Sequence, residues 1–232
     1  MSRRASAAFL AAFALAVASG CGGGTAATAK RAEEPRLDVE AKPAPLRVLV
    51  LGDSNLHESG MAVDGALQSL SLASTIHGVP SFGLKDLDGY WLPELGRLLR
   101  PAPALVVVAL GTNDAVRDDD VRLFPSRLDT LMGALGDRPV VWVTHVARRP
   151  GGVPDGGQVV NAAILAAPAR WPNLTVLDLT PVLSADPSLL RADELHFSDT
   201  GRVVYAEQIA AAVGARLPVT LPQISLPLAS GG

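Results

Sequence analysis

The stretch Ala104-Leu105-Val106-Val107-Val108-Ala109-Leu110, followed at once by Gly111-Thr112-Asn113-Asp114, decides the fold of this chain. Its first part is apolar without interruption, and its second part is a glycine and polar residues. A strand of continuous rather than alternating apolar residues is buried on both faces, which is typical of a parallel sheet covered by helices. The sequence therefore predicts a central parallel strand ending in a polar turn, where open α/β sheets bind their ligands.

Shorter apolar runs elsewhere in the chain repeat this pattern. Further strands are predicted at 46–51, 74–79, 140–143 and 174–177. Helical patterns fill the gaps, at 61–72, 92–99, 121–135, 159–167 and 200–217, with Pro125 expected to interrupt the third. Strands that alternate with helices predict an α/β fold, a three-layer sandwich with a five-stranded parallel sheet.

The composition limits the possible classes of function. Of the 232 residues, 48% are hydrophobic and 19% are charged, which is globular rather than disordered. Aromatic residues make up only 4%, so we expect a core of Leu, Val and Ala. The net charge is −3 and there is no basic tract, so we expect no nucleic-acid partner.

The N-terminus carries the features of an export signal. Arg3 and Arg4 precede an apolar stretch at 7–17, which is too short to span a bilayer comfortably. The following Ala18-Ser19-Gly20-Cys21 resembles a bacterial lipobox, in which the cysteine is lipidated and becomes the mature N-terminus. Cys21 is the only cysteine, which excludes an intramolecular disulfide. The alternative is an ordinary signal cleavage that leaves Cys21 as a free thiol.

These features divide the chain into four parts. Residues 1–20 are predicted to be a lipoprotein signal peptide, and 21–45 a flexible linker of about 25–30 Å end to end. Residues 46–217 form the folded domain, and 218–232 a tail rich in Pro and Leu, whose packing is left open. We therefore expect an exported protein of the bacterial cell envelope, anchored to the membrane through Cys21.

A candidate nucleophile follows the first predicted strand, in the segment Gly52-Asp53-Ser54-Asn55. A serine hydroxyl attacks well only when a base takes its proton. Asp193 and His196 are three residues apart, and on one helical turn this spacing places both side chains on the same side. His196 could then face Ser54 while Asp193 holds its other ring nitrogen. His145, at the end of the 140–143 strand, is the alternative base.

Acyl transfer also needs donors for the developing oxyanion. The side-chain amide of Asn113 and the backbone N–H of Ser54 are candidates, because both follow predicted strands. A backbone N–H near Gly83 is a third candidate, with Gly78 as its rival. The sequence has no cluster of residues at zinc spacing and no phosphate-binding loop.

Together, these segments resemble the SGNH-hydrolase superfamily, also called GDSL esterases/lipases, over roughly residues 46–215. The resemblance implies an SGNH or flavodoxin-like fold and a serine esterase that needs no cofactor or metal. It implies Ser54, Asp193 and His196 as catalytic residues, and Ser54, Gly83 and Asn113 as the oxyanion hole. Gly83 lies thirty residues before Asn113, close to the family's spacing. The first segment departs from the family pattern, because Asn55 stands where Leu is usual.

The resemblance implies hydrolysis of acyl esters, O-acetyl esters among them, through an acyl-enzyme. The segment 160–178 also resembles SGNH domains fused to membrane acyltransferases that acetylate cell-surface polysaccharides. The alternatives are therefore an O-acyltransferase acting on envelope polysaccharide, with an acylated glycan as partner, or a catalytically inactive envelope-binding lipoprotein. The substrate and its acyl length are left open by the sequence.

Overall fold

The computed structural model describes residues 44–117, 120–144 and 155–218, and the fold is given for these residues. The predicted signal peptide, Cys21 and His145 lie outside the described residues, as do nearly all of the predicted linker and tail.

A parallel sheet of five strands forms the middle layer, in the order β2-β1-β3-β4-β5. The strands are β1 (Arg47–Gly52), β2 (Ala73–Gly78), β3 (Leu105–Ala109), β4 (Val140–Val143) and β5 (Leu174–Leu177). All four pairings are parallel, so the predicted fold class is confirmed. The central strands are buried almost throughout, whereas the edge strands β2 and β5 are mostly half-buried.

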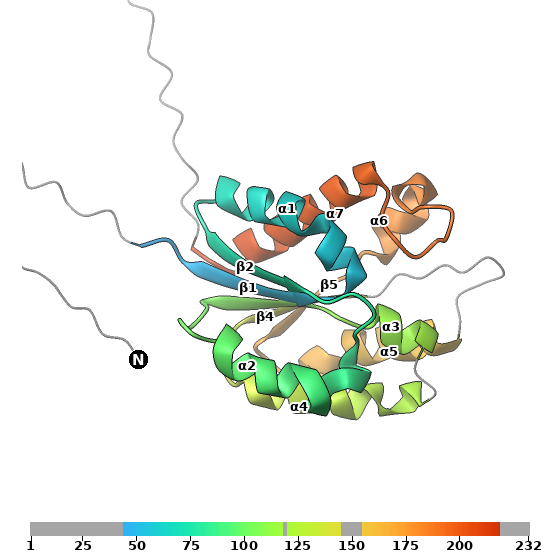
Figure 1. Cartoon of the computed structure of the whole chain (residues 1–232), viewed down its shortest axis with the longest axis horizontal. Coiled ribbons are helices and arrows are strands. Elements are labelled where there is room, and N and C mark those ends of the chain that lie inside the picture. Colours follow the sequence, from blue (N-terminus) through green and yellow to red (C-terminus); the bar gives the residue numbers. More distant parts are fainter. Residues whose placement is uncertain (1–43, 118–119, 145–154, 219–232) are drawn as a thin grey trace, which may run out of the picture. The chain divides into compact units, whose positions relative to one another are not determined.

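Helices cover both faces of the sheet (Figure 1). One face carries α1 (Ser54–Ser69), α6 (Thr180–Ala185) and α7 (Asp199–Gly214). The other carries α2 (Leu92–Leu98), α3 (Thr112–Arg117), α4 (Phe124–Leu135) and α5 (Asp155–Ala166). Short helical turns lie at Leu84–Asp86, Leu87–Trp91, Val121–Leu123, Ala167–Ala169 and Pro187–Leu189. None of the helices in the described ranges is long and apolar enough to cross a membrane.

The two faces of the sheet contribute to separate cores. Leu49 and Leu51 of β1 pack with the side chains of α2, α4 and α5, whereas Val48 and Val50 pack with α1 and α7. Successive strand residues point to opposite faces, so a strand covered on both sides must be apolar at every position. This is the physical reason for the continuous apolar runs.

Several helix boundaries differ from the sequence prediction. The first helix begins at Ser54 rather than at 61, because the Asp53 carboxylate caps it by accepting from the Asn55 N–H at 3.0 Å. Pro125 lies in the first turn of α4 and does not interrupt a helix, since proline is tolerated there. The last helix ends at Gly214 rather than at 217, and α3 and α6 were not predicted.

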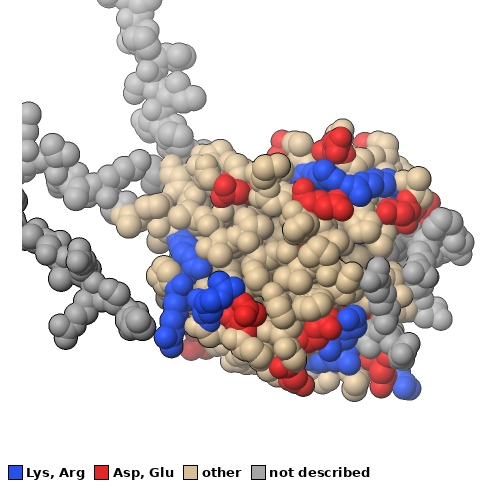
Figure 2. All heavy atoms as spheres, in the orientation of Figure 1, with Lys and Arg blue, Asp and Glu red and all other residues tan. Residues whose placement is uncertain are grey.

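Charged side chains are dispersed over the face drawn in Figure 2. Basic and acidic groups lie beside one another in small clusters, and uncharged surface separates the clusters. This face therefore offers no extended patch of one sign to a strongly charged polymer.

Candidate active site

Ser54 is positioned by the junction between β1 and α1. A Cβ on Gly52 would lie 2.6 Å from the Leu56 Cβ, so only glycine allows the helix to start so close to the strand. Ser54 is the first residue of α1, where backbone N–H groups have no partner within the helix. Its N–H thus lies at a helix start, and its binding of an oxyanion stays a prediction.

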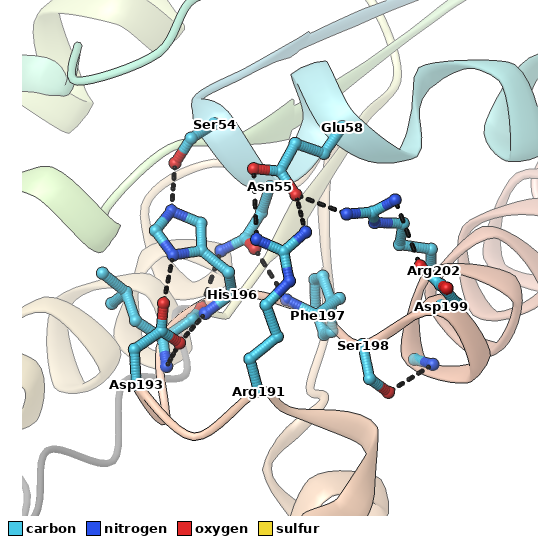
Figure 3. Close-up of polar contacts among 12 residues, drawn as sticks. Ser54, Asn55, Glu58, Arg191, Asp193, His196, Phe197, Ser198, Asp199 and Arg202 are labelled. Carbon is cyan, nitrogen blue, oxygen red and sulfur yellow. Dashed lines mark hydrogen bonds and ion pairs between the residues drawn. The ribbon is translucent and has the colours of Figure 1, made fainter.

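The structure brings Ser54, His196 and Asp193 together in a line (Figure 3). The Ser54 Oγ lies 3.0 Å from the His196 Nε2, and the His196 Nδ1 lies 2.8 Å from the Asp193 Oδ2. A carboxylate only accepts, so Nδ1 carries the hydrogen and the neutral ring leaves Nε2 free to accept the Ser54 proton. The arrangement is that of a nucleophile, a base and the group that orients the base.

The Asp193–His196 segment is a turn, not the helical turn that the spacing suggested. The Asp193 Oδ1 accepts hydrogen bonds from the backbone N–H groups of Leu195 at 3.0 Å and His196 at 2.9 Å, and Glu194 takes a positive φ of 51°. An aspartate readily closes such a turn with its own side chain. Both carboxylate oxygens of Asp193 thus hold the histidine, one through its backbone and one through its ring.

These hydrogen bonds also control the charge of Asp193. Partial burial alone would raise the pKa of this carboxyl, but the bonds from the backbone and ring of His196 and from the Leu195 backbone outweigh it. The pKa of Asp193 is lowered to about 2. Asp193 therefore remains ionised at any pH at which a neutral histidine can act as a base.

Asn113 is the second residue of α3 and lies four residues after the end of β3, the strand that pairs with β1. Its side chain is buried, and its Nδ2 donates to the Phe82 carbonyl at 2.9 Å. An amide nitrogen carries two hydrogens, and among the described residues the Phe82 carbonyl accepts one of them. The oxyanion role of Asn113 stays a prediction.

Gly83 differs from the expectation. Its N–H donates to the Asp86 Oδ2 at 2.9 Å, while the carbonyl of the same peptide, from Phe82, accepts from Asn113. The carbonyl and N–H of a trans peptide point in opposite directions. The Gly83 N–H and the Asn113 amide therefore do not converge on one oxygen in this structure. The rival Gly78 packs against α1, where a Cβ would lie 2.5 Å from the His57 nitrogen.

Asp114 is a site residue to which the sequence analysis gave no role. It is fully buried, and its carboxylate accepts from the backbone N–H groups of Leu84 at 2.8 Å and Lys85 at 2.7 Å. A Cβ on Gly83 would lie 2.3 Å from this carboxylate, which explains the glycine there. The sequence did contain a signal for this role. Asp114 follows Asn113 shortly after a strand predicted to be buried, and a carboxylate buried there without a partner would be costly.

Asp53 is the second buried acid beside the candidate nucleophile. Burial raises its pKa to about 6, although hydrogen bonds from Thr112 and from the Asn55 backbone act in the opposite direction. Its Oδ2 has no hydrogen-bond partner among the described residues. Asp53 therefore resists ionisation, in contrast to Asp193.

The other described histidines lie apart from this arrangement. His57 is exposed, and His77 packs beside Tyr90, whose hydroxyl lies 3.0 Å from the His77 Nε2. Burial lowers the pKa of His77. Within the described ranges no group of three or more His, Cys, Asp or Glu side chains could hold a metal ion.

A hydroxyl, an imidazole and a carboxylate in series, with an amide nearby for negative charge, can transfer an acyl group. At the carboxyl edge of a five-stranded parallel α/β sheet, this geometry defines the class of SGNH-type serine hydrolases. The sequence profile of the GDSL-like lipase/acylhydrolase family matches residues 50–203. The chain belongs to this family.

Solved structures agree with this fold. A lipase/acylhydrolase from Enterococcus faecalis shares 24% identity, with 75% of this chain and 98% of that chain covered and a TM-score of 0.64. A lipolytic G-D-S-L family protein from Veillonella parvula shares 18%, with 74% and 100% covered and a TM-score of 0.61. The C-terminal catalytic domain of Streptococcus pneumoniae peptidoglycan O-acetyltransferase A shares 19%, with 75% and 95% covered and a TM-score of 0.60. Comparison with curated proteins finds no match.

Proposed function

We propose that this protein hydrolyses carboxylic esters through an acyl-enzyme formed on Ser54. The observation that carries the proposal is the continuous line from the Ser54 Oγ to the His196 Nε2 at 3.0 Å, and from the His196 Nδ1 to the Asp193 Oδ2 at 2.8 Å. Membership of the acylhydrolase family supports the same reaction.

In the first half of the reaction, the Ser54 Oγ bonds to the acyl carbon while its proton moves to the His196 Nε2. The carbonyl oxygen becomes an oxyanion, bound by the Asn113 amide and the Ser54 N–H. The tetrahedral intermediate collapses, and the leaving alkoxide takes the proton from His196. Gly83 can join the oxyanion hole only after its N–H leaves Asp86.

In the second half, a water molecule attacks the acyl-enzyme and gives its proton to the His196 Nε2. Collapse of the second intermediate returns that proton to Ser54 and releases the acid. The ionised Asp193 stabilises the imidazolium in both halves, and keeps the ring in the tautomer that accepts from oxygen.

The proposal is tested with p-nitrophenyl esters of increasing acyl length and with a fluorophosphonate probe. Wild-type protein should release p-nitrophenol and be labelled at Ser54, and Ser54→Ala should do neither. Ser69→Ala is the matched control, because Ser69 lies at the far end of the same helix, where its hydroxyl donates to the Ala66 carbonyl. Labelling that persists in Ser54→Ala contradicts the proposal.

A second candidate is transfer of an acetyl group to an envelope polysaccharide by the same residues. It is supported by the sequence of residues 160–178 and by the fold shared with a peptidoglycan O-acetyltransferase domain. The two reactions differ in the acceptor of the acyl group, a sugar hydroxyl or water. An acetyl-ester donor supplied with and without peptidoglycan fragments separates them, because transfer produces acetylated glycan and hydrolysis produces free acetate.

A third candidate, an inactive envelope-binding lipoprotein, is disfavoured because the hydroxyl, imidazole and carboxylate are all in hydrogen-bonding contact.

The proposal includes export and attachment to the membrane through a lipid on Cys21. Its support is the sequence alone, in which an apolar segment ends in Ala18-Ser19-Gly20-Cys21. With two or more acyl chains the attachment should be stable, whereas a single chain gives only marginal binding. Cys21→Ser should move the protein from the membrane to the soluble fraction or leave it unprocessed. A soluble wild-type protein whose mass lacks lipid overturns this part of the proposal.

A further inference from the structure

The Asn55 side chain bridges α1 and the turn that carries His196 (Figure 3). Its Nδ2 donates to the Leu195 carbonyl at 3.1 Å, and its Oδ1 accepts from the Phe197 N–H at 3.3 Å. The side chain is buried, with 8% of Asn55 exposed, and it reaches the residues on either side of His196.

The backbone of His196 itself is bound within its own loop. Its N–H donates to Asp193, and its carbonyl accepts from the Arg191 N–H at 2.8 Å. These local bonds fix the shape of the turn, but they do not attach the turn to α1. The Asn55 amide supplies that attachment through both flanking peptides.

We propose that Asn55 is a positioning residue that sets the distance between Ser54 and His196. The inference rests on the catalytic roles proposed above. Ser54 and Asn55 are consecutive at the start of α1, and Leu195 and Phe197 are the sequence neighbours of His196. A pair of hydrogen bonds between these neighbours therefore couples the hydroxyl to the imidazole across 142 residues of sequence. A leucine side chain at position 55 can make neither bond.

Burial makes these two hydrogen bonds matter. Phe197 is 6% exposed, so its N–H cannot turn to water when Asn55 is replaced. A buried backbone donor without a partner is costly, and the loop is expected to move to satisfy it. Ion pairs of Glu58 with Arg191 and with Arg202, the latter at 2.6 Å, join the same elements further out. The side chains of Glu58, Arg191 and Arg202 are 30%, 39% and 27% exposed, so they form a partly buried network that adds to the attachment.

The decisive variants are Asn55→Leu, which removes both bonds, and Asn55→Asp, which keeps the acceptor for Phe197 but loses the donor to Leu195. Displacement of a reacting group by about 1 Å can lower a rate about 100-fold. We expect kcat for p-nitrophenyl acetate and the rate of fluorophosphonate labelling to fall about 10- to 100-fold in Asn55→Leu. Both rates of Asn55→Asp should lie between those of Asn55→Leu and wild type. KM should stay constant in both variants, because the ester is not bound by this amide.

Gln68→Leu is the matched control, since it places leucine at an exposed polar position of the same helix, where the Gln68 amide donates to the Asp64 carboxylate. It should label at the wild-type rate. All rates are taken per folded molecule, below the thermal midpoint of each variant. Labelling of Asn55→Leu at the wild-type rate overturns the proposal.

Hydrogen exchange of the Phe197 amide tests the attachment independently of any activity. Exchange should be faster in Asn55→Leu than in Gln68→Leu, and equal rates overturn the proposal. If wild type neither cleaves esters nor labels while Phe197 is protected by Asn55, the proposed function fails but the attachment stands. If wild type is active and the Asn55 variants match it in rate and exchange, the attachment alone fails.

Discussion

Ser54 and His196 are 3.0 Å apart, but the molecule supports them by different means. Ser54 follows a strand whose residues Val48 to Leu51 are completely buried, and it begins a helix of 16 residues. His196 lies in a turn, where its position depends on hydrogen bonds that involve the side chains of Asp193 and Asn55. The position of the hydroxyl is thus a property of the core, whereas that of the imidazole depends on a few polar contacts.

The aspartates on the two sides differ in the same way. Asp53, beside Ser54, is 1% exposed and its pKa is raised to about 6. The side chain of Asp193, beside His196, is 47% exposed and its pKa is lowered to about 2. Ionised Asp53 therefore destabilises the folded state at neutral pH, whereas ionised Asp193 is stabilised by its surroundings.

The largest effect is expected on the nucleophile side, from Ser54→Ala. Ester hydrolysis should fall by about 10⁵- to 10⁶-fold, because without the hydroxyl the other groups have nothing to activate. The thermal midpoint should stay close to wild type, since the strand and helix do not depend on the Ser54 side chain. Both are measured on one preparation by steady-state kinetics and thermal unfolding. A large drop in the midpoint contradicts the view that the core alone positions this residue.

On the base side, Asp193→Asn should lower kcat about 10⁴-fold, because an amide no longer fixes the histidine tautomer or stabilises its charge. The turn should survive, since an asparagine oxygen can still accept from the Leu195 and His196 backbones. Circular dichroism checks the fold while kcat is measured with p-nitrophenyl acetate. Unfolding of this variant at moderate temperature would show that the carboxylate is a structural requirement first.

Asn113→Ala tests a residue supported, like Ser54, by the end of a buried strand. If its amide binds the oxyanion, kcat should fall about 10²- to 10³-fold, which corresponds to roughly 3–4 kcal/mol. KM should hardly change, because the amide binds charge that develops only in the transition state. The Phe82 carbonyl also loses its partner, so kcat is compared with the thermal midpoint of the same variant. An unchanged kcat per folded molecule removes Asn113 from the catalytic set.

The smallest effect concerns Asp53 and the pH dependence of stability. The folded state holds the Asp53 proton up to about pH 6, while the unfolded chain releases it near 3.8. Between these values the folded state binds more protons, so the free energy of unfolding falls as pH rises, by about 3 kcal/mol in all. Asp53→Asn should lack this fall. Urea unfolding of both proteins at pH 4 and pH 7 measures the difference, and parallel pH profiles contradict it.

The sequence predicted the scaffold better than the contacts between distant segments. The strands Val140–Val143 and Leu174–Leu177 have the predicted bounds. The first is buried throughout, where only apolar residues fit, whereas the second is a mostly half-buried edge strand that includes Thr175. The prediction missed the start of α1 because its first two turns lack the apolar pattern of a helix. They contain polar residues such as Asn55, and a glycine, Gly60. Asn55 bonds to residues about 140 positions away, and no local pattern encodes such a partner.

At the site, residue type was more informative than spacing. Asp-x-x-His at three residues fits a helix and a turn equally well, and the hydrogen bonds that Asp193 accepts from the Leu195 and His196 backbones select the turn. The hydrogen bond of the Gly83 N–H could not be predicted from the sequence either, since several acidic residues nearby could accept it. That acid is Asp86, which closes the helical turn of Leu84–Asp86.

The direction of β1 has a practical consequence for handling the protein. The strand enters the sheet at Arg47 and leaves it at Gly52, two residues before Ser54. Six residues of strand extend about 20 Å, so the point at which the chain joins the domain and the reactive hydroxyl lie at opposite edges of the sheet. A bead, sensor chip or fusion partner coupled ahead of residue 44 would attach to the domain at the edge of the sheet opposite Ser54. Enzyme immobilised in this way should keep its turnover number towards large, surface-bound substrates.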